Sequence, residues 1–113
     1  MSQITTHVLD TSKGVPAEGI KITLQKPLKN NLWKDITSGV TNNDGRIPNF
    51  LSDNEVLQPG IYRMLFDTQS YFQNNNTNGF YPYVPIVFEI KDTEHYHVPL
   101  LLNPYGYSTY RGS

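Results

Sequence analysis

Histidines are the residues of this chain best suited to acid–base chemistry. Two of the three, His95 and His97, lie two positions apart, and His7 is the third. If residues 95–97 form a regular strand, both rings project from the same face, roughly 7 Å apart, and could line one pocket. An imidazole takes up or releases a proton near neutral pH, because its ordinary pKa is about 6.5. These three residues are therefore the first candidates for a functional site.

The same residues allow two other interpretations. His-x-His on a strand is a known metal-ligand spacing, and His7 could add a third nitrogen, as in three-histidine zinc sites. Against a metal site, the nearby carboxylates Asp92 and Glu94 precede the strand and are typical of a turn. Each histidine could also be a structural imidazole whose hydrogen bonds are satisfied. We expect no metal ion and no cofactor.

Most of the elements that position these residues are predicted to be β-strands. Apolar residues repeat at period two, and clusters of Gly, Pro, Asn and Asp interrupt them at short intervals. The predicted strands cover residues 4–9, 20–25, 32–40, 61–66, 86–90, 95–102 and 107–110. One helical turn is predicted at Thr68–Phe72, capped by Thr68 or Ser70, and residues 73–79 are predicted to be an exposed loop. The predicted fold class is all-β, an eight-stranded β-sandwich of two four-stranded sheets, which needs one strand more than the seven ranges identified.

Composition limits the possible functions. A chain of 113 residues is expected to form a single domain, residues 1–113, and the absence of cysteine excludes disulfides, thiolate metal sites and a cysteine nucleophile. A net charge of -1 without any Lys/Arg cluster argues against nucleic acid as a partner. With 37% hydrophobic residues the core is expected to be small, which favours an oligomer. Eight tyrosines suit interfaces and polar pockets.

Neither a membrane span nor a secretory signal is expected. The longest apolar run, residues 98–102, is interrupted by Pro99 and is far shorter than the roughly 20 residues that cross a bilayer. The first residues lack a basic segment followed by an apolar one. We therefore expect a soluble, cytoplasmic protein.

The C-terminal residues carry the most specific motif. The stretch Tyr107–Ser113 resembles the C-terminal signature of the transthyretin-related 5-hydroxyisourate hydrolases, whose tail tetrapeptide is Tyr-Arg-Gly-Ser. Further stretches resemble motifs of the same family, namely Thr6–Asp10, Gly14–Ala17, Asp44–Ile47, Phe80–Pro82 and His95–Leu101. The resemblance extends from Ile4 to Ser113 and departs from the family in the Asn-rich loop and at Val84–Pro85.

The resemblance implies a fold, an activity and a set of site residues. It implies an eight-stranded sandwich with one short helix, assembled as a homotetramer, a dimer of dimers, whose active sites open from a channel between dimers. The implied reaction is the hydrolysis of 5-hydroxyisourate to 2-oxo-4-hydroxy-4-carboxy-5-ureidoimidazoline in urate degradation. Carried over by motif, the catalytic residues are His7, Arg46, His97 and Ser113, and Tyr110 helps to bind the small-molecule substrate.

The chemistry of these residues agrees with that reaction. Opening an amide-like ring needs a base for water, a group that stabilises the oxyanion, and a proton for the leaving nitrogen. His7 and His97 can supply the base and the acid, and the Arg46 guanidinium can bind two oxygens of a flat anion. Ser113, through its hydroxyl or a terminal carboxylate, can orient water or substrate. His95 is expected at the pocket rim.

Two rival functions remain open from the sequence. The related transthyretins use the same sandwich and channel to carry thyroid hormones without catalysis, and fold alone does not decide between them. A carrier site for a large apolar hormone favours aliphatic lining, whereas His7, Arg46 and His97 place charge and hydrogen-bonding groups there. An immunoglobulin-like structural module would explain the strands but not the clustered histidines and tyrosines.

Overall fold

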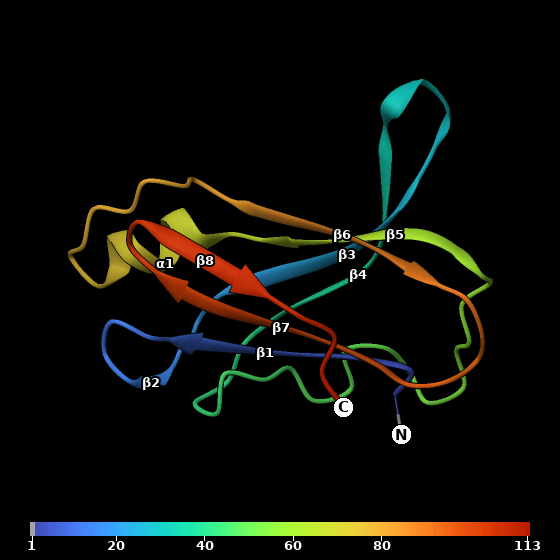
Figure 1. The fold of residues 1–113 in the computed structure, drawn as a ribbon, viewed down its shortest axis with the longest axis horizontal. Coiled ribbons are helices and arrows are strands. Elements are labelled where there is room, and N and C mark those ends of the chain that lie inside the picture. Colours follow the sequence, from blue (N-terminus) through green and yellow to red (C-terminus); the bar gives the residue numbers. More distant parts are fainter. Residues whose placement is uncertain (1) are drawn as a thin grey trace.

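Two four-stranded β-sheets face each other in the computed structural model, which describes residues 2–113 (Figure 1). The sheet that carries the histidines has the order β2-β1-β7-β8, and the other has the order β4-β3-β5-β6. The first sheet contains β1 (Ile4–Asp10), β2 (Val15–Pro16), β7 (Tyr96–Asn103) and β8 (Gly106–Thr109). The second contains β3 (Lys21–Pro27), β4 (Trp33–Val40), β5 (Gly60–Phe66) and β6 (Val84–Ile90). The predicted eight-stranded sandwich of two four-stranded sheets is confirmed.

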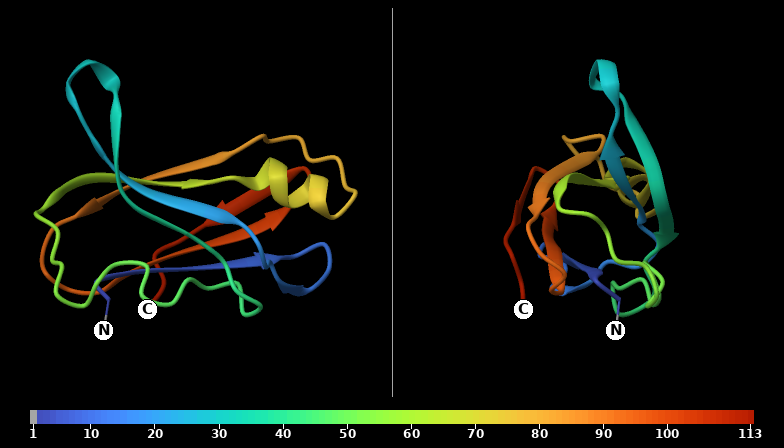
Figure 2. Two further views of the ribbon diagram at one scale, coloured as in Figure 1. Left: turned by 180° about the vertical axis from the view of Figure 1, so that it is seen from behind. Right: turned by 90° about the vertical axis from the view of Figure 1, so that its right-hand side faces the viewer.

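Helical structure is confined to two short segments of residues 2–113. The helix α1 (Thr68–Asn74) follows β5, and a single 3-10 turn (Lys29–Asn31) lies between β3 and β4. Figure 2 shows the β3–β4 hairpin projecting away from the sandwich. Within the described residues there is no helix with the length and apolar character that crossing a bilayer requires.

Alternation along the strands gives the β2-β1-β7-β8 sheet two different faces. Along β1, Ile4 and Val8 are fully buried in the core, whereas Thr5 and His7 are half-buried and point the opposite way. Strands β1 and β7 pair in parallel with Thr5 opposite His97 and His7 opposite Pro99. Because paired residues in register share a face, Thr5, His7 and His97 gather on the outer face of the sheet.

Two local predictions were wrong around the helix. The N-cap of α1 is Asp67, whose carboxylate accepts hydrogen bonds from the N–H and the hydroxyl of Ser70. Thr68 is not the cap, because its hydroxyl donates to the Tyr81 carbonyl at 3.0 Å. The helix also continues through Asn74, two residues beyond the predicted turn.

Strand limits also differ from the prediction, each by one or two residues. Strand β6 begins at Val84 and includes Pro85, which is tolerated because β6 is an edge strand and proline lacks only a hydrogen-bond donor. Strand β1 runs on to Asp10, where a turn was predicted, and Asp10 is buried. Its carboxylate accepts a hydrogen bond from the Tyr71 hydroxyl at 2.7 Å, which links β1 to α1. The two-residue strand β2 was not predicted.

Candidate active site

His7 lies beside Arg46 because the loop that follows β4 folds back onto β1. His7 and Arg46 form an isolated antiparallel bridge, and the Val8 N–H donates to the Gly45 carbonyl at 2.9 Å. The side-chain oxygen of Asn42 accepts from the Arg46 N–H at 3.1 Å and so fixes the turn. Arg46 itself is exposed. The turn that the sequence predicted therefore delivers a guanidinium to the outer face of the sheet.

Glycine is required at the centre of this turn. Gly45 has a φ of 73°, in the left-handed region that side-chain-bearing residues rarely adopt. A Cβ atom there would overlap the Val8 carbonyl oxygen and lie 3.3 Å from the His7 ring. Only glycine allows the loop to approach β1 this closely, which explains why Arg46 directly follows a glycine.

His97 is covered by the C-terminal residues. The Gly112 N–H donates to the His97 carbonyl at 2.9 Å, and the two residues form an isolated antiparallel bridge. A Cβ atom at Gly112 would overlap His97 Cδ2, so the backbone of Gly112 lies against the imidazole ring. The tail that carries the predicted Ser113 is thus positioned on β7 at the histidine.

Thr5, which the sequence reasoning did not select, lies between His95 and His97. Its hydroxyl oxygen is 2.8 Å from His95 Nε2 and 2.8 Å from His97 Nδ1. The two imidazole rings are 6.4 Å apart between centroids, with planes inclined by 23°. The two histidines therefore lie on the same face of the sheet, as predicted, and a hydrogen bond with Thr5 holds His95 there.

Burial and positive charge lower the pKa of both candidate catalytic histidines. For His97, burial lowers the pKa most, followed by the charge of Arg46 and by coupling to His95 and His7. For His7, burial lowers the pKa most, followed by the charge of Arg46. Asp44 opposes this shift through a backbone hydrogen bond and through its negative charge. Both rings are thus mainly neutral at neutral pH, which is the form that accepts a proton. The couplings also place Arg46, His7 and His97 in one electrostatic cluster.

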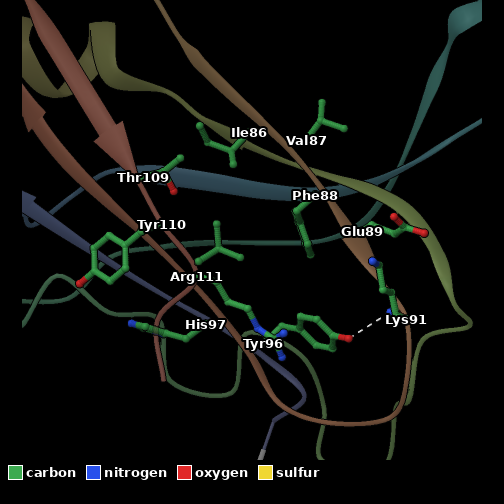
Figure 3. A pocket seen from close by; sticks show the side chains of 11 residues that line it. Ile86, Val87, Phe88, Glu89, Lys91, Tyr96, His97, Thr109, Tyr110 and Arg111 are labelled. Carbon is green, nitrogen blue, oxygen red and sulfur yellow. Dashed lines mark hydrogen bonds between the residues drawn. The ribbon is translucent and has the colours of Figure 1, made fainter.

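The remaining predicted residues, Tyr110 and Ser113, are both exposed. Tyr110 shares a pocket of about 350 Å³ with His97 and with residues of the edge strand β6. Figure 3 shows His97 and Tyr110 at one end of this pocket and Tyr96 and Lys91 at the other. The Arg111 guanidinium stacks 4.3 Å from the centre of the Tyr96 ring, which anchors the tail just before Gly112 and Ser113.

The arrangement thus brings His7, Arg46 and His97 onto one face, with the tail laid across it. Tyr110 lies at the edge of this group, and Ser113 follows the glycine that covers His97. Among residues 2–113, no three His, Cys, Asp or Glu side chains have an arrangement that could hold a metal ion. The groups present can take up a proton, donate one and bind an oxyanion.

Known proteins with similar sequences and folds carry two kinds of names. A mouse 5-hydroxyisourate hydrolase is 45% identical over 116 residues, covering 99% of this chain and 96% of the relative. The structure of Klebsiella pneumoniae 5-hydroxyisourate hydrolase superposes with a TM-score of 0.84 at 35% identity, covering 100% of this chain and 94% of the other. Sea bream transthyretin in complex with thyroxine has a TM-score of 0.89 at 29% identity, with 97% and 94% covered.

The sequence model of the HIUase/Transthyretin family matches residues 4–112, nearly the whole chain. This range includes the two strands and the turn that carry His7, Arg46 and His97. The chain therefore belongs to the HIUase/transthyretin family.

Proposed function

We propose that this protein hydrolyses 5-hydroxyisourate to 2-oxo-4-hydroxy-4-carboxy-5-ureidoimidazoline, a step of urate degradation. The observation that carries the proposal is the convergence of His7, Arg46 and His97 on the outer face of the β2-β1-β7-β8 sheet. The names of the relatives at 40–50% identity support the same substrate.

The proposed reaction divides the work among three side chains. A neutral imidazole, His97 or His7, takes a proton from water as the water oxygen bonds to the amide-like ring carbonyl carbon. The Arg46 guanidinium stabilises the negative charge that develops on the carbonyl oxygen. The bond from this carbon to the ring nitrogen then breaks, and the proton taken from water by the first imidazole is passed to the departing nitrogen, with the second imidazole relaying it. The product is a carboxylate and a free ureido nitrogen.

Two further residues complete the proposed site. Ser113 is proposed to hydrogen-bond water or substrate, and the contact of the preceding Gly112 with His97 supports this role. Tyr110 is proposed as a substrate-binding residue at the mouth of the pocket that it shares with His97. The proposal uses no metal ion and no cofactor.

A spectrophotometric assay tests the function directly. Urate oxidase generates 5-hydroxyisourate from urate, and the decay of its absorbance is followed with and without this protein. We expect decay well above the spontaneous rate. Decay at the spontaneous rate with correctly folded protein would rule the proposal out.

Carriage of a hormone is the second candidate, because sea bream transthyretin in complex with thyroxine has nearly the same fold. The chemistry of the outer face favours the hydrolase, since a guanidinium and imidazoles suit a polar anion better than a large apolar ligand. Titration with thyroxine, followed by calorimetry, distinguishes the two. Tight binding together with an absence of hydrolysis would favour a carrier.

We also propose a homotetramer built as a dimer of dimers. Strands β6 and β8 are edge strands of the two sheets, and residues from both sides line the pocket that contains Phe88 and Tyr110. Unpaired edges of this kind are suited to extension by a second copy. Pairs would then meet through the outer face that carries His7 and His97, which leaves the substrate in a shared channel.

The assembly is tested by light scattering after gel filtration. The wild-type protein is expected to elute with the mass of four chains. Val87 on the edge strand β6 is 57% exposed, and Val87→Asp is expected to break the tetramer into smaller species. A monomeric wild-type protein would contradict this assembly. A cytoplasmic location belongs to the same proposal and can be checked by cell fractionation.

A further inference from the structure

Thr5 connects two histidines that the reaction does not use equally. Its half-buried hydroxyl lies 2.8 Å from His97 Nδ1 and 2.8 Å from His95 Nε2. Strand pairing sets this position, because Thr5 on β1 is directly opposite His97 on β7. The position of the Thr5 hydroxyl beside His97 is therefore fixed by the strands of the sheet and not by a loop.

The single hydrogen of the Thr5 hydroxyl limits how it can bond to the two rings. A hydroxyl has one hydrogen, so Thr5 can donate to only one of the two rings. If it donates to His95, it accepts from an N–H at His97 Nδ1, and His97 Nε2 carries the lone pair. If it donates to His97 instead, the proton of a neutral His97 sits on Nε2, which then cannot accept a proton from water. The direction of one hydroxyl thus selects the tautomer of His97.

The two directions are not equivalent during a reaction. A base that takes a proton on Nε2 becomes an imidazolium with hydrogens on both nitrogens. With Thr5 donating to His95, the His97 Nδ1–H contact is unchanged when Nε2 gains that proton. If Thr5 instead donates to His97, an imidazolium at His97 would bring the Nδ1 hydrogen and the Thr5 hydroxyl hydrogen together, and the hydroxyl would have to rotate away.

The tail leaves one nitrogen of His97 for the substrate. Thr5 occupies Nδ1, and the backbone of Gly112 lies against the Cδ2 side of the ring. Nε2 is the ring nitrogen left for water or substrate, which is the atom that a base would use.

We infer that Thr5 is a positioning residue that donates its hydroxyl hydrogen to His95 and holds the His97 proton on Nδ1, so that Nε2 acts as the base. His95 is the acceptor that fixes the hydroxyl direction. This inference rests on the proposed hydrolase function and assigns the role of general base to His97.

Matched substitutions test the positioning role by kinetics. Thr5→Val keeps the shape of the side chain and removes the hydroxyl. We expect kcat to fall roughly tenfold or more with little change in KM, because the group that orients a functional histidine is lost. Thr5→Ser restores a hydroxyl and is expected to restore kcat. His95→Gln keeps an acceptor near the Nε2 position and is expected to be milder than His95→Leu.

Thr6→Val is the matched control. Thr6 is the next residue of β1, and its hydroxyl donates to the Val98 carbonyl at 2.7 Å on the buried face of the same sheet. Thr6→Val is expected to lower the melting temperature and leave kcat unchanged. If Thr5→Val behaves like Thr6→Val, Thr5 is only structural and the inference is overturned.

Nitrogen-15 NMR of the imidazole rings gives a readout independent of turnover. We expect the neutral His97 ring of the wild-type protein to carry its proton on Nδ1, and Thr5→Val to give a mixture of tautomers. A wild-type His97 ring with its proton on Nε2 would overturn the inference even if hydrolysis is observed. Absence of hydrolysis in the wild type would instead defeat the proposed function, and the two failures are thereby distinguished.

Discussion

The two faces of the β2-β1-β7-β8 sheet are made from alternate residues of the same strands, and they have opposite character. The inner face carries fully buried apolar side chains such as Ile4, Val8 and Leu100. The outer face carries His7 and His97, which are only half-buried and lie close to Arg46. The period of two therefore separates residues that stabilise the fold from residues of the candidate site.

Neighbouring threonines show how sharp this separation is. Thr6 points inward, and its hydroxyl donates a hydrogen bond to the Val98 carbonyl, which connects β1 to β7. Thr5 points outward, and its hydroxyl meets the side chains of His95 and His97. The same residue type thus belongs to the core at one position and to the candidate site at the next.

The largest expected effect comes from removing an imidazole on the outer face. His97→Ala or His7→Ala is expected to lower kcat by about 10²–10⁴, because each loses general acid–base catalysis. The melting temperature is expected to stay near that of the wild type, since neither ring belongs to the core. Steady-state kinetics and thermal unfolding measure the two quantities, and near-wild-type turnover in either variant would remove that residue from the mechanism.

Removing the tail is expected to produce the next largest loss. Deletion of residues 110–113 takes away Tyr110, Ser113 and the Gly112 contact with His97, and we expect most turnover to disappear. Gly112→Ala is the milder version, because its Cβ would push the tail off the His97 ring. Both variants should keep the far-ultraviolet circular dichroism of a sandwich. Normal hydrolysis by the deletion variant would show that the tail has no catalytic part.

An inner-face substitution should have the reverse pattern. Leu100 is fully buried, and Leu100→Ala is expected to lower the free energy of unfolding by about 2–5 kcal/mol through lost burial and the remaining cavity. The fraction that stays folded should hydrolyse substrate at close to the wild-type kcat. Urea unfolding and activity per folded molecule test this, and an equal loss of kcat would mean that the two faces are not separable.

A smaller effect is expected from pH. The pKa values of His7 and His97 are lowered in the folded protein, whereas in the unfolded chain they return to about 6.5. Below that pH the unfolded chain binds more protons than the folded one, so the free energy of unfolding should decrease as pH falls. The neutral bases should also survive to lower pH, which places the acid limb of kcat/KM below 6.5. A limb centred above this value would contradict the assigned environment.

The smallest expected effect is that of metal removal. Because the proposal assigns every proton transfer to imidazole, dialysis against a strong chelator is expected to leave kcat unchanged. Loss of activity that returns on addition of zinc would revive the alternative in which His95 and His97 are metal ligands. A chelator-treated sample of Thr6→Val serves as a control for general destabilisation.

Local pattern was enough to predict most of the sheet, and the family resemblance supplied the candidate site residues. Alternating apolar residues identified seven strands, and the turn at Asn42–Gly45 placed Arg46 at a bend. The family motifs then named His7 and His97, which the structure brings to one face. Position within a strand follows from nearby residues, so such features are readable from sequence.

Contacts between distant segments could not be read in this way. The parallel pairing of β1 with β7 joins Thr5 to His97 across a separation of 92 residues, and nothing near Thr5 signals this partner. The prediction of the N-cap of α1 was wrong for a related reason, because the Thr68 hydroxyl donates to the Tyr81 carbonyl in another segment. Tertiary contacts determine both the partner of Thr5 and the cap of α1, and local sequence propensity contains no information about such contacts.

The pairing of β1 with β7 has a consequence for folding kinetics. A site whose parts lie on strands so far apart in sequence forms only after a large loop has closed, and such non-local pairing is slow. The antiparallel pairs β3–β4 and β5–β6 close shorter loops and can form earlier. During refolding, native strand signals should therefore appear before hydrolysis returns, and the recovery of turnover would report the final docking of the first strand.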